Sequence, residues 1–278
     1  MYAQDEDGVF LKDPYASIFA NPGSDLWGDN RDNKSGSFQG YANFTFKILP
    51  ELTFSSEGLY TDNHSRYGRF TTSKQTPGDS ATGSFQSNQS YSWRNINTLN
   101  YTNDFGDHHV NLTAAFELTQ SKSSYTSISG DGLDNEALTY WNMSAFNSNG
   151  VLNGFSNSGM VSWICRAVYS YQGKYSATAT IRADAASQFR DKYKWGYFPS
   201  LAVAWNAEKE DFIDNTKIQQ LKLRASVGQI GNSGVDAYTV YSKLSPDYAR
   251  NNTLMGFWPA TVSNPNVHWE KTTQYNLG

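Results

Sequence analysis

Polar and hydrophobic residues alternate with a period of two along much of this chain. From Ser37 to Ile48, one face of an extended chain would carry Phe38, Gly40, Ala42, Phe44, Phe46 and Ile48, and the other Ser37, Gln39, Tyr41, Asn43, Thr45 and Lys47. A turn follows at residues 49–51, and the alternation resumes at Leu52. This period predicts two β-strands joined as a hairpin.

The hairpin unit recurs along the rest of the chain. The further expected strands cover residues 91–102, 109–120, 161–171, 175–186, 195–206 and 220–230, and a last one begins near Val267. Long segments rich in Ser, Asn, Gly and Asp separate the hairpins, at residues 62–83, 121–157 and 231–266. We therefore expect an all-β fold of about nine antiparallel strands. Short turns at one end and long loops at the other are typical of outer-membrane barrels.

Most charged residues of the expected strands fall on the face opposite the hydrophobic one, and Lys271, which shares a face with Trp269 and Tyr275, is an exception. If the hydrophobic face points outward, the residues expected to face the lumen of a barrel include Glu57, Glu117, Arg166, Arg182, Asp184, Lys222 and Arg224. A transmembrane barrel requires this segregation, because Arg or Lys facing lipid at the membrane midplane costs about 2–4 kcal/mol. A soluble β-sandwich also separates its faces. Its buried face is expected to be richer in Leu, Ile and Val than these strands are.

Composition excludes several classes of protein. Of the 278 residues, 15% are aromatic and 17% are charged, and the net charge of −4 gives no electrostatic footprint for nucleic acid. The single cysteine, Cys165, excludes an intramolecular disulfide and a cysteine-based zinc cage. No run approaches the length of about eighteen apolar residues that a transmembrane helix needs. The mean hydropathy of −0.62 is compatible with barrel strands, whose two faces average out.

No pattern in the chain indicates catalysis or a cofactor. The carboxylates Asp131, Asp134 and Glu136 share one expected loop, where solvated turn residues are favoured over a calcium site. Nothing fixes a pair of carboxylates in one cleft, as acid–base catalysis requires. We expect a protein that is not an enzyme and that carries no metal or cofactor.

Aromatic residues in the expected loops are candidates for contact with a substrate. The three that we single out are Tyr140, Trp141 and Trp258. Aromatic faces stack on sugar rings, and neighbouring Asn and Asp side chains bond hydroxyl groups. The competing interpretation, in which these rings pack the loops together, is favoured because large aromatic residues usually serve packing.

Four segments resemble parts of SusC/RagA-type TonB-linked outer-membrane proteins. They are residues 196–212, which begin Gly-Tyr-Phe-Pro-Ser; residues 221–232, which begin Leu-Lys-Leu-Arg-Ala-Ser; residues 264–276, which contain Asn-Pro-Asn and Trp-Glu-Lys-Thr-Thr-Gln-Tyr-Asn; and Arg166 with residues 169–182. Their order and spacing match that family from about Ser37 to the end of the chain. Two departures are Ala185-Ala186, where Gly-Ser is expected, and Cys165, where Gly is usual. Small residues fill both places, so the expected fold is unaffected.

The resemblance implies a barrel of about 22 strands with a plug domain in its lumen. This chain would hold a partial barrel in residues 37–278, preceded by an extracellular loop region in residues 1–36, without plug, signal peptide or C-terminal strands. Such proteins import oligosaccharides or peptides across the bacterial outer membrane. Their partners are a SusD-like surface lipoprotein, the TonB complex and outer-membrane lipid. The alternatives are an outer-membrane porin or adhesin, and a soluble β-rich carbohydrate-binding protein.

Overall fold

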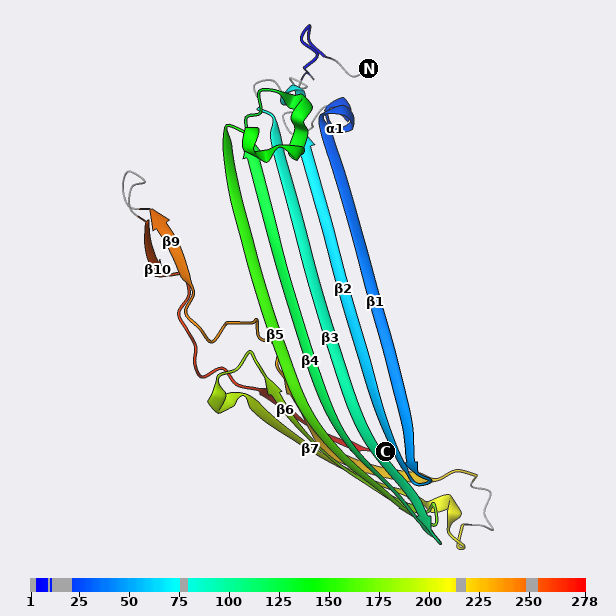
Figure 1. Cartoon of the computed structure of the whole chain (residues 1–278). Helices are drawn as coiled ribbons and strands as arrows, with labels where there is room; N and C mark the ends of the chain where they lie inside the picture. The colour runs from blue at the N-terminus through cyan, green and yellow to red at the C-terminus, as the bar shows by residue number, and fades with distance from the viewer. Residues whose placement is uncertain (1–3, 10, 12–21, 76–79, 214–218, 249–254) are drawn as a thin grey trace. The chain divides into compact units, whose positions relative to one another are not determined.

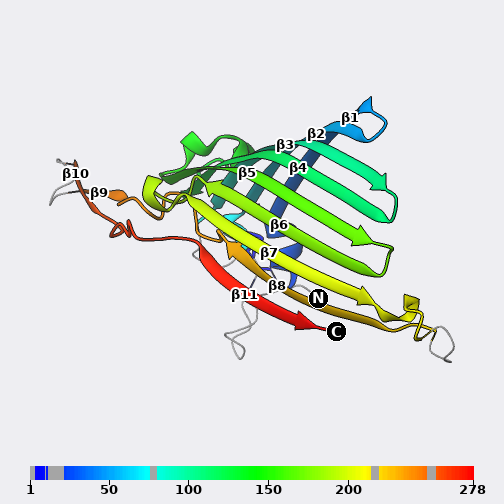
Figure 2. The same cartoon turned by 90° about the horizontal axis from the view of Figure 1, so that it is seen from below.

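The computed structural model describes residues 4–9, 11, 22–75, 80–213, 219–248 and 255–278. Its main strands are β1 (Asp29–Leu49), β2 (Leu52–Thr71), β3 (Thr82–Phe105), β4 (His108–Asp131), β5 (Ser148–Tyr171), β6 (Tyr175–Ala186), β7 (Trp195–Asn206), β8 (Lys222–Asn232) and β11 (Glu270–Leu277). These nine strands form one sheet in the order β1-β2-β3-β4-β5-β6-β7-β8-β11. Figure 1 shows β1 to β5 side by side, and Figure 2 shows β6, β7, β8 and β11 continuing the sheet. The expected all-β fold of about nine strands is confirmed.

The remaining elements are short. They are α1 (Pro22–Gly28), the 3₁₀ helices η1 (Ser73–Gln75), η2 (Glu136–Trp141), η3 (Met143–Ala145), η4 (Asp191–Tyr193) and η5 (Ala207–Lys209), and a separate two-stranded sheet of β9 (Leu244–Tyr248) and β10 (Met255–Pro259). In the part of the chain that the structure describes, no helix has the length and apolar character needed to cross a membrane.

The first five strands are much longer than the alternation predicts. They hold 20 to 24 residues each, which corresponds to roughly 66–80 Å at about 3.3 Å per residue. A tilted strand crosses a bilayer with only about 9–11 residues. The prediction of loops at residues 62–71, 121–131 and 148–157 is wrong, and β1 begins at Asp29 rather than Ser37. Segments of Ser, Asn and Gly lack the hydrophobic face by which a strand is recognised in a sequence.

Short turns join the strands at one end of the sheet. Residues 50–51 join β1 to β2, residues 106–107 join β3 to β4, and residues 172–174 join β5 to β6. Gly106 (φ +60°) and Gly173 (φ +62°) adopt the left-handed backbone that only glycine reaches without steric cost. The expected short turns are thus confirmed, and each fixes the register of the hairpin that it closes.

The chain forms two compact units. Unit 1 comprises Met1–Gln39, Thr61–Ser92 and Lys122–Ser156, and unit 2 comprises Gly40–Tyr60, Trp93–Ser121 and Asn157–Gly278. Each unit has its own hydrophobic cluster. That of unit 1 contains Phe70, Ala81, Leu133, Tyr140 and Phe146, and that of unit 2 contains Ala186, Phe189, Phe198 and Trp269.

The cluster of unit 1 holds the connection between β4 and β5 against the strands. A Cβ atom at Gly83 or Gly130 would lie 2.4 or 2.5 Å from the ring of Phe146. These glycines therefore provide the space in which the ring packs. Near the start of the connection, the Asn135 side chain accepts a hydrogen bond of 3.2 Å from the backbone of Ala137 and caps η2.

Candidate functional site

The register of β5 to β8 separates two chemically different faces in unit 2. In every pair that joins these strands, even-numbered residues face even-numbered partners and odd-numbered residues face odd-numbered ones. Neighbours along a strand point to opposite faces, and directly paired residues share a face. We call the face with even-numbered residues in β5 to β8 the polar face, and the other the apolar face.

The polar face carries every lumen candidate of these strands. They are Arg166, Arg182, Asp184, Lys222 and Arg224. Glu117 of β4 lies on the same face, because its carboxylate is 3.7 Å from the Arg182 guanidinium. The assignment of this face to the lumen of a barrel stays a prediction.

Glu57 is the last of these candidates, and its face follows from its neighbours. The Asn95 amide donates a hydrogen bond of 3.5 Å to the Ser56 hydroxyl, so these two side chains share one face. Arg94 and Glu57 therefore share the other. Because Arg94 Nε is 3.7 Å from Glu117 Oε1, that other face is the polar face. All seven candidates thus lie on it.

Three of the candidates, Glu117, Arg182 and Asp184, form a charged cluster with Arg94 and Ser162 across β3 to β6, which we call the Arg182 cluster. Arg182 Nε donates hydrogen bonds of 2.8 Å to both carboxylate oxygens of Asp184, and Nη2 donates one of 3.1 Å to Ser162 Oγ. Asp184 is 5% exposed and Ser162 is fully buried. Glu117 joins Arg182 to Arg94. A buried carboxylate is tolerated when a guanidinium satisfies it at hydrogen-bond distance.

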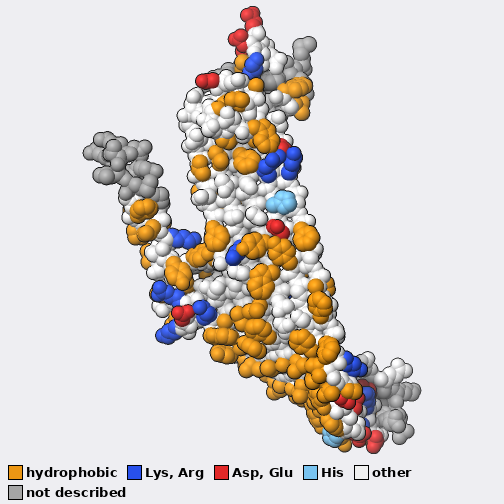
Figure 3. Space-filling view, in the orientation of Figure 1, with side chains coloured by type: hydrophobic (Ala, Val, Ile, Leu, Met, Phe, Trp, Pro, Cys, Tyr) orange, Lys and Arg blue, Asp and Glu red, His pale blue; other side chains and the backbone are white. Residues whose placement is uncertain are grey.

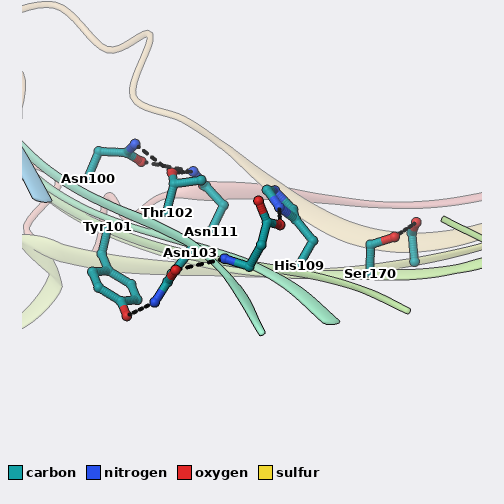
Figure 4. A network of polar contacts seen from close by, with 9 residues as sticks. Asn100, Tyr101, Thr102, Asn103, His109, Asn111 and Ser170 are labelled. Carbon is teal, nitrogen blue, oxygen red and sulfur yellow. Dashed lines mark hydrogen bonds and ion pairs between the residues drawn. The ribbon is translucent and has the colours of Figure 1, made fainter. Parts of the chain in front are cut away.

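An uncharged network continues the polar face towards the short turns. Asn111 Nδ2 donates hydrogen bonds to Thr102 Oγ1 (2.6 Å) and Asn100 Oδ1 (3.2 Å). Figure 4 shows these three residues on one side of the strands, with Tyr101 and Asn103 on the other. Sequence reasoning did not single out this network or Ser162. Their position on the same face as the charged residues was the available signal.

The apolar face is free of charge in β5 to β8 and open to its surroundings. Within the paired positions of β5 to β8, it holds no Asp, Glu, Lys or Arg. Its exposed large side chains include Trp163, Tyr169, Tyr175, Ile181, Tyr197, Leu201, Val203 and Leu223. Figure 3 shows hydrophobic side chains gathered near the short turns, with few charges among them. Soluble monomers rarely expose a large patch of this kind, which is typical of a surface that contacts a membrane or another protein.

Hydrogen bonds to Glu210, which we call the polar strap, join the start of β6 to the end of β7. The carboxylate of Glu210 accepts hydrogen bonds from Tyr175 Oη (2.5 Å), Trp205 Nε1 (3.1 Å) and Lys174 Nζ (3.2 Å). These donors hold the pKa of the Glu210 carboxyl below its usual value, and the hydrogen bond from Tyr175 has the largest effect. The strap fixes the connection that follows β7 against the turn at residues 172–174.

The three loop aromatics have different surroundings. Tyr140 is buried, and its hydroxyl donates a hydrogen bond of 3.1 Å to Asp32 Oδ2. Burial raises the pKa of the Tyr140 hydroxyl, and the hydrogen bond to Asp32 raises it further by a smaller amount. Its ring packs in the core of unit 1, which leaves it unavailable as a substrate contact. Trp141 is exposed beneath the Arg66 guanidinium, 4.7 Å from the ring centroid, and Trp258 is exposed on β10. Contact of Trp141 and Trp258 with a substrate stays a prediction.

The acidic residues of the loop after β4 have separate partners. Glu136 accepts a hydrogen bond of 2.9 Å from the backbone of Ser73, and Asp131 accepts one from the Ser80 hydroxyl. Among the described residues, no three His, Cys, Asp or Glu side chains gather as a metal site would require.

Comparison with known proteins adds sequence and fold relationships. A family profile described as TonB dependent receptor-like, beta-barrel, matches residues 2–278. Two TonB-dependent receptors of Formosa agariphila are 28% identical over 279 residues and 30% identical over 293 residues, covering 99% and 98% of this chain but 27% and 29% of the receptors. The TonB-dependent receptor SusC of Bacteroides thetaiotaomicron is 36% identical over 126 residues, which cover 43% of this chain and 13% of SusC.

Solved structures give the same fold. The structure of the RagAB peptide transporter superposes with a TM-score of 0.79 at 19% identity, over 89% of this chain and 28% of that one. The chain thus spans less than a third of the length of these relatives. The expected resemblance to SusC/RagA-type proteins is confirmed. This chain belongs to the TonB-dependent receptor-like β-barrel family, whose relatives are outer-membrane proteins, and it forms part of such a barrel.

Proposed function

We propose that this chain is part of the wall of a TonB-dependent transporter that imports a nutrient, such as an oligosaccharide or a peptide, across the bacterial outer membrane. The observation that carries the proposal is the separation of the two faces of unit 2. Seven charged residues share the polar face, and the apolar face carries no charge at the paired positions of β5 to β8. An aqueous interior and a lipid exterior require this distribution.

The Arg182 cluster has a specific place in this proposal. It lies on the face that would line the interior, and it combines two guanidinium groups with two carboxylates. We assign it the role of holding the barrel wall in a fixed shape where a plug would contact it. Charged groups inside a membrane are stable when they face a polar interior and pair with one another.

The partners follow from the same proposal. A SusD-like lipoprotein would cover the extracellular end, and the TonB complex would supply the energy for import. The transporter would release its substrate unchanged, so it is not an enzyme. Residues from Asp29 onward would belong to the barrel, which moves the boundary of the preceding loop region to residue 28.

Alternating accessibility tests which face meets lipid. In the full-length receptor, with Cys165 replaced by Ser, nitroxide labels are placed at Ala179, Leu201 and Val203, and at Thr180, Ser200 and Ala202 as matched neighbours. Labels at the odd positions should show high collision rates with oxygen, which partitions into lipid, and labels at the even positions low rates. Equal rates at both sets would exclude a lipid-facing apolar surface.

Dependence on TonB distinguishes a transporter from a porin or adhesin. Cells that contain the full-length receptor are compared with cells that lack it and with cells that lack TonB, during growth on single glycans and peptides. We expect one substrate whose uptake is lost both in cells without the receptor and in cells without TonB. Uptake that persists without TonB indicates a porin, and unchanged growth on every substrate removes the import function.

A further inference from the structure

Unit 1 carries a groove of about 560 Å³ that none of the expected site residues line. It crosses the sheet over β1, β2, β3 and β4, and its lining includes Ser37, Asn63, Ser65, Asn88, Ser123 and Tyr125. This volume is within the range of about 300–1,000 Å³ that small-molecule sites occupy. With strands about 4.8 Å apart, four strands give the groove a length of roughly 14 Å, which suits a short oligomer.

Side-chain contacts place these residues on one face. Ser37 Oγ donates a hydrogen bond of 2.7 Å to Asn63 Oδ1, and Asn88 Nδ2 donates one of 3.2 Å to Ser65 Oγ. Ser65 is two positions from Asn63, so these four side chains face the same way.

Residues of β4 complete that face. Lys122 Nζ lies 5.6 Å from the ring centroid of Tyr91, so these two share the opposite face. Ser123 and Tyr125 of β4 therefore face the same way as Asn88 of β3. The amides and hydroxyls of four neighbouring strands thus point into one groove.

The lining contains no Asp, Glu, Lys or Arg. His64 is the remaining basic side chain of the lining, and its ring lies over Gly36, where an added Cβ would be 2.4 Å from the ring. Gly36 is next to Ser37, so Gly36 points to the opposite face of the sheet. The His64 ring that lies over Gly36 therefore also belongs to the face opposite the serine and asparagine side chains. A charged ligand group would lose hydration in this groove without gaining a counter-charge. The groove therefore selects for a neutral ligand.

The position of the groove also disfavours a peptide. An extended peptide gains affinity mainly by pairing its backbone with a free strand edge. This groove crosses the face of the sheet, where β2 and β3 are hydrogen-bonded on both sides. The groove instead offers short Ser and Asn side chains, each of which can donate and accept hydrogen bonds. Such side chains match the hydroxyl groups of a sugar, which also donate and accept.

Tyr125 adds an aromatic platform. An added Cβ at Gly154 would be 2.2 Å from Tyr125 Cε1, so the hydroxyl-bearing part of the ring lies against that glycine. The residue is 43% exposed and lines the groove. An aromatic face with a polar hydroxyl offers both contact area and a hydrogen bond to a ring-shaped, hydroxyl-rich ligand.

We propose that this groove is a subsite for a neutral, polyhydroxylated ligand, namely an uncharged oligosaccharide, and that it restricts the transporter to this substrate class. The inference rests on the proposed import function and narrows its substrate. Hydrogen bonds from Asn63 and Asn88 would orient the sugar hydroxyls, and the Tyr125 ring would support one sugar face.

Direct binding to the purified full-length receptor tests the proposal. The probes are neutral glucan, mannan, galactan and xylan oligosaccharides, oligogalacturonate as an acidic glycan, and a mixture of short peptides, measured by calorimetry. The variants are Tyr125→Ala, Tyr125→Phe and Asn63→Ala, and the matched control is Lys122→Gln on the opposite face. The yield of each variant in the outer membrane shows whether it folds.

We expect at least one neutral oligosaccharide to bind. Its affinity should fall about tenfold in Tyr125→Ala and about fivefold in Asn63→Ala, with little change in Lys122→Gln. Tyr125→Phe should keep most of the affinity, because the ring remains. Binding of only oligogalacturonate or peptides, or neutral binding that none of the groove variants weakens, would overturn the inference. In those cases the proposed import function is still supported if uptake requires TonB. It is rejected only if no substrate is imported.

Discussion

Arg182 and Asp184 are joined by two hydrogen bonds of 2.8 Å between residues two positions apart on one strand. Alternation along a strand puts both side chains on the same face, so a single strand supplies the pair. The guanidinium also reaches Glu117 and Ser162 on two neighbouring strands. One cation therefore connects three strands, β4, β5 and β6, on the polar face.

Removal of Asp184 should destabilise the barrel. Asp184→Ala leaves the Arg182 guanidinium without its closest partner, and because this guanidinium is 35% exposed and keeps Glu117 and Ser162, the loss should cost about 1–3 kcal/mol. We expect a lower midpoint of unfolding for the full-length receptor in detergent. Asp191→Ala is the control, because the Asp191 side chain is 98% exposed in its pair with Lys194. Equal effects of the two substitutions would contradict a structural role of the Arg182 cluster.

Acid should weaken the start of β1 in unit 1. Hydrogen bonds from Arg69 and then Arg31 lower the pKa of Asp29 from 3.8 to about 2. A lowered pKa in the folded state gives stability that is present above about pH 4 and is lost as the pH falls towards 2. Both guanidinium groups are partly exposed, so we discount the effect to about 1 kcal/mol. Hydrogen exchange of residues 29–31, corrected for intrinsic rates, should accelerate through this window.

The matching variant is Asp29→Asn. It removes the titrating carboxylate, so exchange of residues 29–31 should be faster at neutral pH and should no longer change between pH 4 and pH 2. An unchanged acid response in Asp29→Asn would assign the effect to another group.

Two glycines should respond differently to the same substitution. In Gly231→Ala, the new Cβ would lie 2.0 Å from Phe198 Cζ, and Trp269 backs that ring at a centroid distance of 5.3 Å. We expect overpacking of this kind to cost about 1–3 kcal/mol. Gly58→Ala is the control, because nothing lies within 4 Å of its Cβ position. Unfolding midpoints of the two variants give the comparison, and a stable Gly231→Ala protein would show that Phe198 can move aside.

The connection between β4 and β5 should loosen when its anchor is removed. Phe146→Ala deletes a buried ring that packs in the positions left open at Gly83 and Gly130, at a cost of about 3–5 kcal/mol. Limited proteolysis should then cut the receptor between residues 132 and 147. Phe155→Ala, which removes a ring that is 62% exposed, should leave the digestion pattern unchanged.

The alternation of residues predicts the two faces of unit 2 well. The parity that separates Arg182 and Asp184 from Ile181 and Leu201 follows from strand geometry alone, because a period of two needs no knowledge of neighbours. The same rule places the seven charged candidates on one face, and they lie on one face in the structure.

The length of β1 to β5 and the packing of the β4–β5 connection could not be predicted in this way. The outer parts of these strands, such as residues 121–131, owe their extended form to backbone pairing with neighbours rather than to a hydrophobic face. Tyr140 is buried in the cluster that contains Phe70, and its hydroxyl bonds Asp32, which is 108 residues away in the sequence. Contacts at that separation leave no local pattern.

The tight turns at Gly106 and Gly173 also determine the order in which the wall can assemble. Closure of a hairpin from its turn outward has the lowest entropic cost, because every additional pair is brought within reach by the one before it. Asp131 and Ser148, at the far ends of β4 and β5, are then among the last residues to find their partners. The Phe146 anchor can dock only after that step, so protection of residues 132–147 would report complete closure of the hairpins on a newly inserted receptor.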